Sequence, residues 1–376
     1  MTIGSQLYAK LRGDRAVWMI VIVLAIFSIL VVYSSTGHIA FKERGGNTEF
    51  YLFKHFIFVA GGLFLTYACY SLHYTRFLRI SPLLLLASIP LLVYTIAFGS
   101  DINQARRWIE LPFLEMTFQT SDFAKLALII YVARTISSKQ EYIKDFKSGF
   151  LPIVMPIIII CGLIAPADLS TAMLLFATCL LMMIMGRVSL KDISWLIMMG
   201  ISTFGLLVAL GEQFPNVIRV DTWMNRMGDF ITNADGGYQI QQAKIAMADG
   251  GIFGLGPGNS VQRNFLPAPY SDFIFAIIIE EYGLIGGFII ISLYVLLFFR
   301  IVRIITNSPK AFGAMLVLGL GLIICIQALA NIAVSVHLVP VTGLTLPLVS
   351  MGGTSIIFSS IAFGMILSVS RYIEKI

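Results

Sequence analysis

Ten apolar stretches follow one another along this sequence, each about as long as a helix that crosses a lipid bilayer. A spanning helix needs roughly 20 predominantly apolar residues. We therefore predict an all-α polytopic membrane protein with about ten transmembrane helices, organised as one transmembrane domain over residues 1–376. The predicted spans are about 15–35, 50–72, 77–98, 119–137, 150–166, 169–186, 191–211, 272–299, 311–335 and 350–370.

Composition agrees with a membrane protein. The 376 residues are 58% hydrophobic and only 12% charged, whereas soluble domains are about 25% charged. The net charge of +6 comes from basic residues between apolar spans, which favours an anionic membrane face over nucleic acid. The four cysteines form no CxxC pair and the histidines no HExxH motif, so the sequence predicts neither a disulfide framework nor a zinc site.

The distribution of Lys and Arg predicts the orientation. With the N-terminus in the cytoplasm, 16 of the 26 basic residues lie on the inner side and nine on the outer side. Because basic residues concentrate in short cytoplasmic loops, we expect both termini inside. The apolar run that ends near Tyr33 is too long for a signal peptide. The outer face then carries two substantial loops, 99–118 and 212–271, the larger one between helices seven and eight.

Charged residues inside spans are costly and mark functional or paired positions. Asp122 and Lys125 are three residues apart in the fourth span, so they share a helix face and can neutralise each other. A structural ion pair and the polar wall of a cavity both remain open. Glu280 and Glu281 lie within the eighth span, and a contact of Lys125 with either is a further option.

Asp272 stands where a polar, glycine-rich loop meets the eighth apolar stretch. We expect Ser271 to cap this helix and Asp272 to lie in its first turn. The carboxylate either complements the helix dipole or serves as an acid–base group. Partial desolvation would raise its pKa, whereas the helix N-terminus and nearby Arg263 or Lys125 would lower it, and the sequence leaves the balance open.

A double arginine, Arg106 and Arg107, stands beside Trp108 in the first outer loop. It either belongs to a loop anchored by its aromatic residue or forms a clamp for a lipid-borne pyrophosphate, because guanidinium groups suit phosphate oxygens. The last outer loop, 331–355, is rich in Gly, Pro, Ser and Thr. Non-helical backbone at that depth requires cover from protein or a watery cavity.

Four segments resemble motifs of one known family, the SEDS proteins. NQARRWIELP followed by QTSDFAKLALIIYVA resembles its NGARRWI…QPSE-x-x-KL pattern, and APADLSTAMLL is similar to its PDLGTALL segment. GYQIQQ, GNSVQRNFLPAPYSDFIFA and EEYGLIG resemble its YQ…GNS-Q…LPE-HTDFIFA…EE-G block, and VPVTGLTLPLVSMGGTS resembles its last motif. The match covers nearly the whole chain in order.

The resemblance implies a peptidoglycan glycosyltransferase that polymerises lipid II at the outer face of the cytoplasmic membrane. The essential aspartate of the family falls on Asp272, as the general base for the acceptor 4-hydroxyl, with undecaprenyl pyrophosphate as leaving group. No metal ligands are implied and no cofactor is firmly implied, although a divalent cation (Mg2+ or Mn2+) is one option. The residues expected to bind substrate or pyrophosphate or to line the cavity are Asp122, Lys125, Arg106, Arg107, Gln239, Asn259, Ser260, Gln262, Glu280 and Glu281.

The resemblance also implies partners and a location. These are lipid II, membrane lipid, a monofunctional class B penicillin-binding transpeptidase and other divisome proteins, without nucleic acid, in the bacterial cytoplasmic (inner) membrane at the division septum. The run Gly258–Gln262 looks more like the division member FtsW than the elongation member RodA. A lipid II flippase or other lipid transporter, and a pure scaffold, are the competing functions. The family's His-Thr before the aspartate is Tyr270-Ser271 here, and the Glu of QPSE is Asp122.

Overall fold

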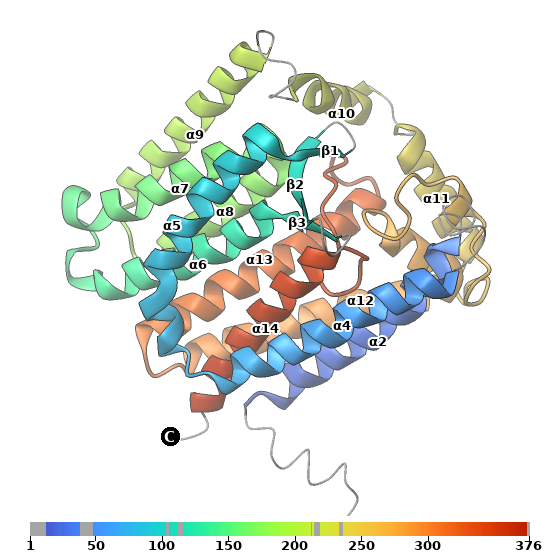
Figure 1. The fold of residues 1–376 in the computed structure, drawn as a ribbon, viewed down its shortest axis with the longest axis horizontal. Helices are drawn as coiled ribbons and strands as arrows, with labels where there is room; N and C mark the ends of the chain where they lie inside the picture. The colour runs from blue at the N-terminus through green and yellow to red at the C-terminus, as the bar shows by residue number, and fades with distance from the viewer. Residues whose placement is uncertain are drawn as a thin grey trace, which may run out of the picture.

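The computed structural model describes residues 13–37, 48–102, 105–111, 116–211, 213, 219–232 and 236–373. The chain forms a bundle of long helices, with a small sheet and two shorter helices gathered at one end (Figure 1). The bundle helices are α2 (Arg15–Ser35), α4 (Thr48–Ser71), α5 (Thr75–Phe98), α6 (Thr120–Ser138), α7 (Leu151–Ile164), α8 (Leu169–Met185), α9 (Leu190–Gly211), α12 (Ile274–Thr306), α13 (Ala311–Ser335) and α14 (Gly353–Ile373). Short helical turns are η1 (Gln140–Tyr142), η2 (Phe146–Phe150) and η3 (Gln262–Asn264).

Each predicted span overlaps with one of these helices. Within the described ranges, eight helices are long and apolar enough to cross a membrane. The two others are α6, which includes Asp122, Lys125 and Arg134, and α8, which has 17 residues. The prediction of a nearly all-helical, multi-pass membrane protein is confirmed, whereas the number of ten spans stays a prediction.

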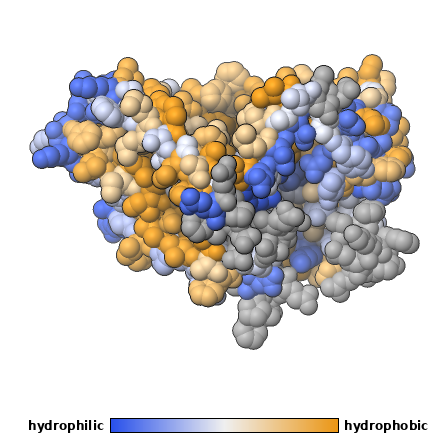
Figure 2. Space-filling view, turned by 90° about the horizontal axis from the view of Figure 1, so that it is seen from above, coloured by the Kyte–Doolittle hydropathy of each residue, from blue (hydrophilic) through white to orange (hydrophobic). Residues whose placement is uncertain are grey.

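The surface has the pattern of a protein that is surrounded by lipid. Figure 2 shows a broad apolar region across the middle of one face, with hydrophilic residues toward its two ends. Large apolar side chains of α5 and α9 are exposed, among them Leu83, Leu86, Met198 and Ile201. Because such an apolar belt would not be stable in water, the bilayer is its natural environment.

Helix α13 lies in the middle of the bundle and packs against α6, α8, α12 and α14 (Figure 1). Two glycines allow its neighbours to approach closely. A Cβ atom on Gly319 would lie 2.6 Å from a methyl group of Ile129 on α6, and one on Gly321 would lie 2.6 Å from a methyl group of Ile301 on α12. Small residues at helix contacts are the usual means of tight packing between membrane helices.

The two predicted outer loops contain regular structure that no pattern in the sequence indicated. In the first, β1 (Ser100–Ile102), β2 (Ala105–Leu111) and β3 (Met116–Gln119) form an antiparallel sheet in the order β1-β2-β3. The second includes α10 (Val220–Thr232) and α11 (Tyr238–Gly250). The sheet, α10 and α11 lie together at the end of the bundle that is remote from the C-terminus (Figure 1).

The predicted start of the eighth span needs a correction. Helix α12 begins at Ile274 with Phe273 at the N-cap position, and no side chain caps it. Ser271 therefore does not cap the helix, and Asp272 lies in a turn before it instead of in its first turn. The difference arises because the backbone of this turn is held by other segments, described below, which fix it in a non-helical conformation.

Helix α12 is also interrupted, at Gly283, where φ is +68°. The glycine-rich segment that follows α11 pairs with this break through backbone hydrogen bonds. The N–H of Leu255 donates to the carbonyl of Glu280 (2.9 Å), and the N–H of Leu284 donates to the carbonyl of Gly251 (2.9 Å). These bonds satisfy backbone groups that the break would leave without partners. The first turns of α12 and the 251–256 segment therefore form one hydrogen-bonded unit.

Candidate functional site

The turn that carries Asp272 is held from behind by α13 and by the segment between α13 and α14. The Nδ2 atom of Asn331 donates to the carbonyl of Asp272 (2.9 Å) and to the carbonyl of Leu344 (2.7 Å). The hydroxyl of Ser350 donates to the carbonyl of Ser271 (2.7 Å). The backbone of the aspartate is thus fixed by side chains that lie far along the sequence, which leaves its carboxylate in a defined position.

The Asp272 carboxylate is half-buried. Its Oδ1 atom accepts a hydrogen bond from the hydroxyl of Ser271 (2.9 Å). On the other side, a Cβ atom on Gly343 would lie 3.6 Å from Oδ2, and Gly343 has a φ of +71°, a conformation that favours glycine. The last loop therefore approaches the carboxylate through backbone, at a position where a larger side chain would be strained.

The sequence left open whether the pKa of Asp272 is raised or lowered, and in the structure burial raises it. Desolvation raises the pKa above the ordinary aspartate value, and the nearby charge of Asp168 adds to this rise. The hydrogen bond from Ser271 and the positive charges of Arg226 and Arg107 oppose the rise without cancelling it. A carboxylate of raised pKa is better suited to accept a proton near neutral pH than an exposed one.

From the raised pKa of Asp272 we predict the pH dependence of any reaction in which this carboxylate is the base. The base form disappears as the pH falls through the raised pKa, so the acidic limb of the rate profile should lie at higher pH than for an exposed aspartate. Removing the Arg226 charge should raise the pKa further. We expect Arg226→Gln to shift the acidic limb to still higher pH, measured as rate against pH for both proteins. An unmoved or lower-lying limb would contradict this assignment.

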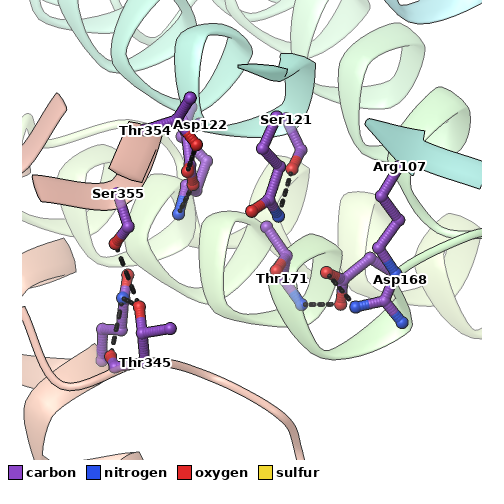
Figure 3. Close-up of polar contacts among 11 residues, drawn as sticks. Arg107, Ser121, Asp122, Asp168, Thr171, Thr345, Thr354 and Ser355 are labelled. Atoms are coloured by element: carbon purple, nitrogen blue, oxygen red, sulfur yellow. Dashed lines mark hydrogen bonds and ion pairs between the residues drawn. The ribbon is translucent and has the colours of Figure 1, made fainter. Parts of the chain in front are cut away.

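Arg107 on β2 is tied to the turn between α7 and α8. Its Nε atom donates to the carbonyl of Ala167 (2.9 Å), and its Nη1 atom forms an ion pair with Asp168 (2.9 Å). The other oxygen of Asp168 accepts from the N–H of Thr171 (3.1 Å) and caps α8. In Figure 3, Arg107 and Asp168 point toward each other. Arg106 precedes Arg107 on β2, and its side chain lies outside the described part of the structure.

Asp122 and Lys125 form the ion pair that their spacing predicted. The Nζ atom of Lys125 lies 2.8 Å from Asp122, whose side chain is only 5% exposed. The hydroxyl of Thr354 on α14 donates to the other oxygen of Asp122 (3.4 Å; Figure 3). The alternative contact of Lys125 with Glu280 or Glu281 is not formed, because both glutamates have other partners.

Glu280 and Glu281 hold the glycine-rich loop against α12. Fully buried Glu280 accepts hydrogen bonds from the hydroxyl of Ser260, from the N–H of Val261 (2.7 Å) and from the N–H of Gln262 (3.1 Å). Glu281 accepts from the hydroxyl of Ser34 on α2. Ser260, Gln262 and the two glutamates, all predicted as site residues, are therefore brought together in one network that fastens the loop.

The two remaining predicted residues lie apart from this network. Asn259 is exposed, and its side chain donates to the carbonyl of Leu255 (2.9 Å). Gln239, in the first turn of α11, lines a pocket of about 130 Å3 together with Arg226 and His337. Arg226 was not predicted as a site residue, although its charge acts on Asp272.

The donor groups near Asp272 do not form a protein-built metal site. Within the described ranges, no three His, Cys, Asp or Glu side chains gather where they could hold one ion. Asp168, whose charge acts on Asp272, is already paired with Arg107. The divalent cation stays a prediction.

Known proteins resemble the chain over nearly its whole length. The FtsW/RodA/SpoVE model, described as cell cycle protein, matches residues 14–375. Stage V sporulation protein E of Bacillus subtilis (strain 168) is 32% identical over 370 residues, which cover 96% of this chain and 98% of that protein. A probable peptidoglycan glycosyltransferase FtsW of Coxiella burnetii is 31% identical, over 95% of this chain and 96% of that protein.

Solved structures share the fold. A chain from a peptidoglycan synthase complex, in which polymerization and crosslinking are coordinated, matches with a TM-score of 0.72 at 21% identity, over 97% of this chain and 99% of that chain. The Rod shape determining protein RodA of Thermus thermophilus matches with a TM-score of 0.68 at 20% identity, over 96% of this chain and 98% of that chain. Because the family model and the two curated relatives match nearly the whole chain, the chain belongs to the FtsW/RodA/SpoVE family of cell cycle proteins.

Proposed function

We propose that this protein is a peptidoglycan glycosyltransferase that polymerises lipid II into glycan strands at the outer face of the cytoplasmic membrane. The curated relatives that carry the FtsW name are described as probable peptidoglycan glycosyltransferases. The observation that carries the proposal is Asp272, a half-buried carboxylate of raised pKa, fixed by backbone hydrogen bonds at the end of the bundle that holds the outer elements.

In the proposed reaction, the 4-hydroxyl oxygen of the acceptor sugar attacks the anomeric carbon of the donor. The bond between that carbon and the phosphate oxygen breaks, undecaprenyl pyrophosphate leaves, and Asp272 takes the hydroxyl proton. A positioned base of this kind contributes to the rate only within hydrogen-bond reach of the proton it accepts. The positive charge of Arg226, which acts on Asp272, would stabilise the ionised form of this base.

We assign the protein to septal synthesis in cell division, acting with a monofunctional class B penicillin-binding transpeptidase. The curated relatives reported above are a sporulation protein and an FtsW protein, which supports division over elongation. The structural neighbour from a complex that couples polymerization to crosslinking supports a transpeptidase partner. The elongation polymerase of the RodA type is the alternative within the family.

The test is purified full-length protein, reconstituted in vesicles with its transpeptidase and with fluorescent lipid II on the outer leaflet. We expect glycan strands, resolved by length on a gel, and no net movement of lipid II between leaflets. Lipid II that crosses the bilayer without being polymerised would instead identify a flippase. Strands formed only when an elongation-type transpeptidase replaces the division-type one would overturn the septal assignment.

A further inference from the structure

A small pocket lies between α10, the start of α11 and the segment that follows α13. Its volume is about 130 Å3, and it is lined by Arg226, Asp229, Phe230, Gln239, His337 and Pro340, among others. It is linked to Asp272 in two ways. The charge of Arg226 acts on Asp272, and the chain that forms one wall continues within a few residues to Gly343, which approaches the carboxylate.

The chemistry of the lining suits an uncharged ring with many hydroxyl groups better than an anion. The positive charge of Arg226 is opposed by the carboxylates of Asp272 and Asp168, which act on it, and the lining itself adds the carboxylate of Asp229, so the pocket offers little excess positive charge to a phosphate. Together with Gln239 and His337, the two charged groups of the lining supply both donors and acceptors. Phe230 adds an aromatic ring, whose face can pack against the C–H groups of a sugar. Pockets that bind small molecules combine apolar and aromatic side chains with a few polar groups in fixed positions.

His337 occupies a position where a glycine would be the simpler choice. Its φ is +59°, and it ends α13 in a Schellman motif. In this motif the N–H of Leu338 donates to the carbonyl of Ala333 (2.8 Å), and the N–H of His337 donates to the carbonyl of Val334 (3.0 Å). This position is usually glycine. The imidazole lines the pocket and packs against Phe230, with ring centroids 5.3 Å apart and nearly perpendicular planes. Backbone strain of this kind is often found at functional sites.

We propose that this pocket binds one N-acetylated sugar ring of the lipid-linked disaccharide and so places a hydroxyl or anomeric centre at Asp272. The proposal rests on the proposed function for the identity of the saccharide. His337 and Gln239 act by holding the sugar, so they are positioning residues and not the base. Their loss should weaken substrate binding, whereas the loss of Asp272 should stop the chemical step.

The decisive variant is His337→Gly, because it removes the imidazole and relieves the strained backbone together. The thermal midpoint of the purified protein should stay unchanged or rise. We expect the KM for lipid II to rise about fivefold, the effect of losing one hydrogen bond, with little change in kcat, and a similar KM effect for Gln239→Ala. Saturation-transfer NMR should show the N-acetylglucosamine–N-acetylmuramic acid disaccharide bound to wild type and weakened in both variants.

Arg187→Gly is the matched control. Arg187 has a φ of +62° and ends α8 in the same motif, with the N–H of Val188 bonded to the carbonyl of Met183 (3.1 Å). It does not line the pocket. Arg187→Gly should relieve backbone strain in the same way as His337→Gly, while the KM for lipid II and disaccharide binding stay at wild-type values.

Three outcomes would overturn the proposal. If wild type polymerises lipid II and both pocket variants keep its KM, the sugar site is wrong and the proposed function stands. If the variants lose binding of inorganic pyrophosphate but not of the disaccharide, the pocket is a phosphate site. If wild type makes no polymer, the proposed function fails, and unchanged disaccharide binding in the variants would then remove the pocket assignment separately.

Discussion

Replacing Asp272 by alanine should lower the rate of lipid II polymerisation by about 10²- to 10⁴-fold, the range typical for loss of a positioned general base. The effect should fall on kcat, because the carboxylate is needed when the acceptor hydroxyl loses its proton. The turn itself should survive, since Asn331 and Ser350 bind its backbone carbonyls and not the carboxylate. The measurement is initial rate of strand formation with the transpeptidase partner present.

Two further variants make this prediction specific. Asp272→Asn keeps the shape of the side chain and should be as inactive as alanine. At pH values above the raised pKa, the ionised carboxylate opposes folding, so Asp272→Asn should be at least as stable as wild type. Asp249→Ala removes an exposed carboxylate of α11 and should polymerise normally. Strands made by Asp272→Ala at the wild-type rate would remove the general-base assignment.

The largest loss of stability should follow from Glu280→Ala. This change leaves the N–H groups of Val261 and Gln262 without the acceptor that they share, and a buried donor without a partner costs about 1–3 kcal/mol. It also frees the hydroxyl of Ser260. We expect a lower thermal midpoint in detergent and faster proteolytic cleavage within 251–264, because the loop is no longer fastened to α12.

The conservative and control variants separate hydrogen bonding from charge. Glu280→Gln retains an oxygen acceptor and should recover much of the lost stability. Glu141→Ala removes an exposed carboxylate from η1 at a distance from the loop and should leave the midpoint unchanged. A Glu280→Ala protein with the wild-type midpoint and cleavage pattern would show that the loop does not depend on this network.

The helices could be predicted because apolar length is a local property of the sequence. The first and ninth predicted spans, 15–35 and 311–335, coincide with α2 and α13. The eighth ended in the prediction at 299, where Arg300 interrupts the apolar run, yet α12 continues to Thr306. The structure explains this: the Nε atom of Arg300 reaches Asp14 at the start of α2 (2.8 Å), so its charge is paired and the helix continues.

The site could be predicted only in part, because its electrostatics arise from tertiary structure. Asp272 stood out as a carboxylate beside an apolar helix. Asp168 and Arg226 act on its pKa from the α7–α8 turn and from α10, and no spacing in the sequence relates these three positions. A signal existed for Asp168, which lies within the APADLSTAMLL motif, but its pairing with Arg107 required the sheet to be known.

The hydrogen bonds behind Asp272 have a consequence for biosynthesis. Asn331 and Ser350 reach back 59 and 79 positions along the chain, so both follow Asp272 in the order of synthesis. During membrane insertion, the aspartate emerges long before the residues that fix its backbone. A nascent chain that has not yet inserted α13 and the segment after it carries the carboxylate without the side chains that fix its backbone.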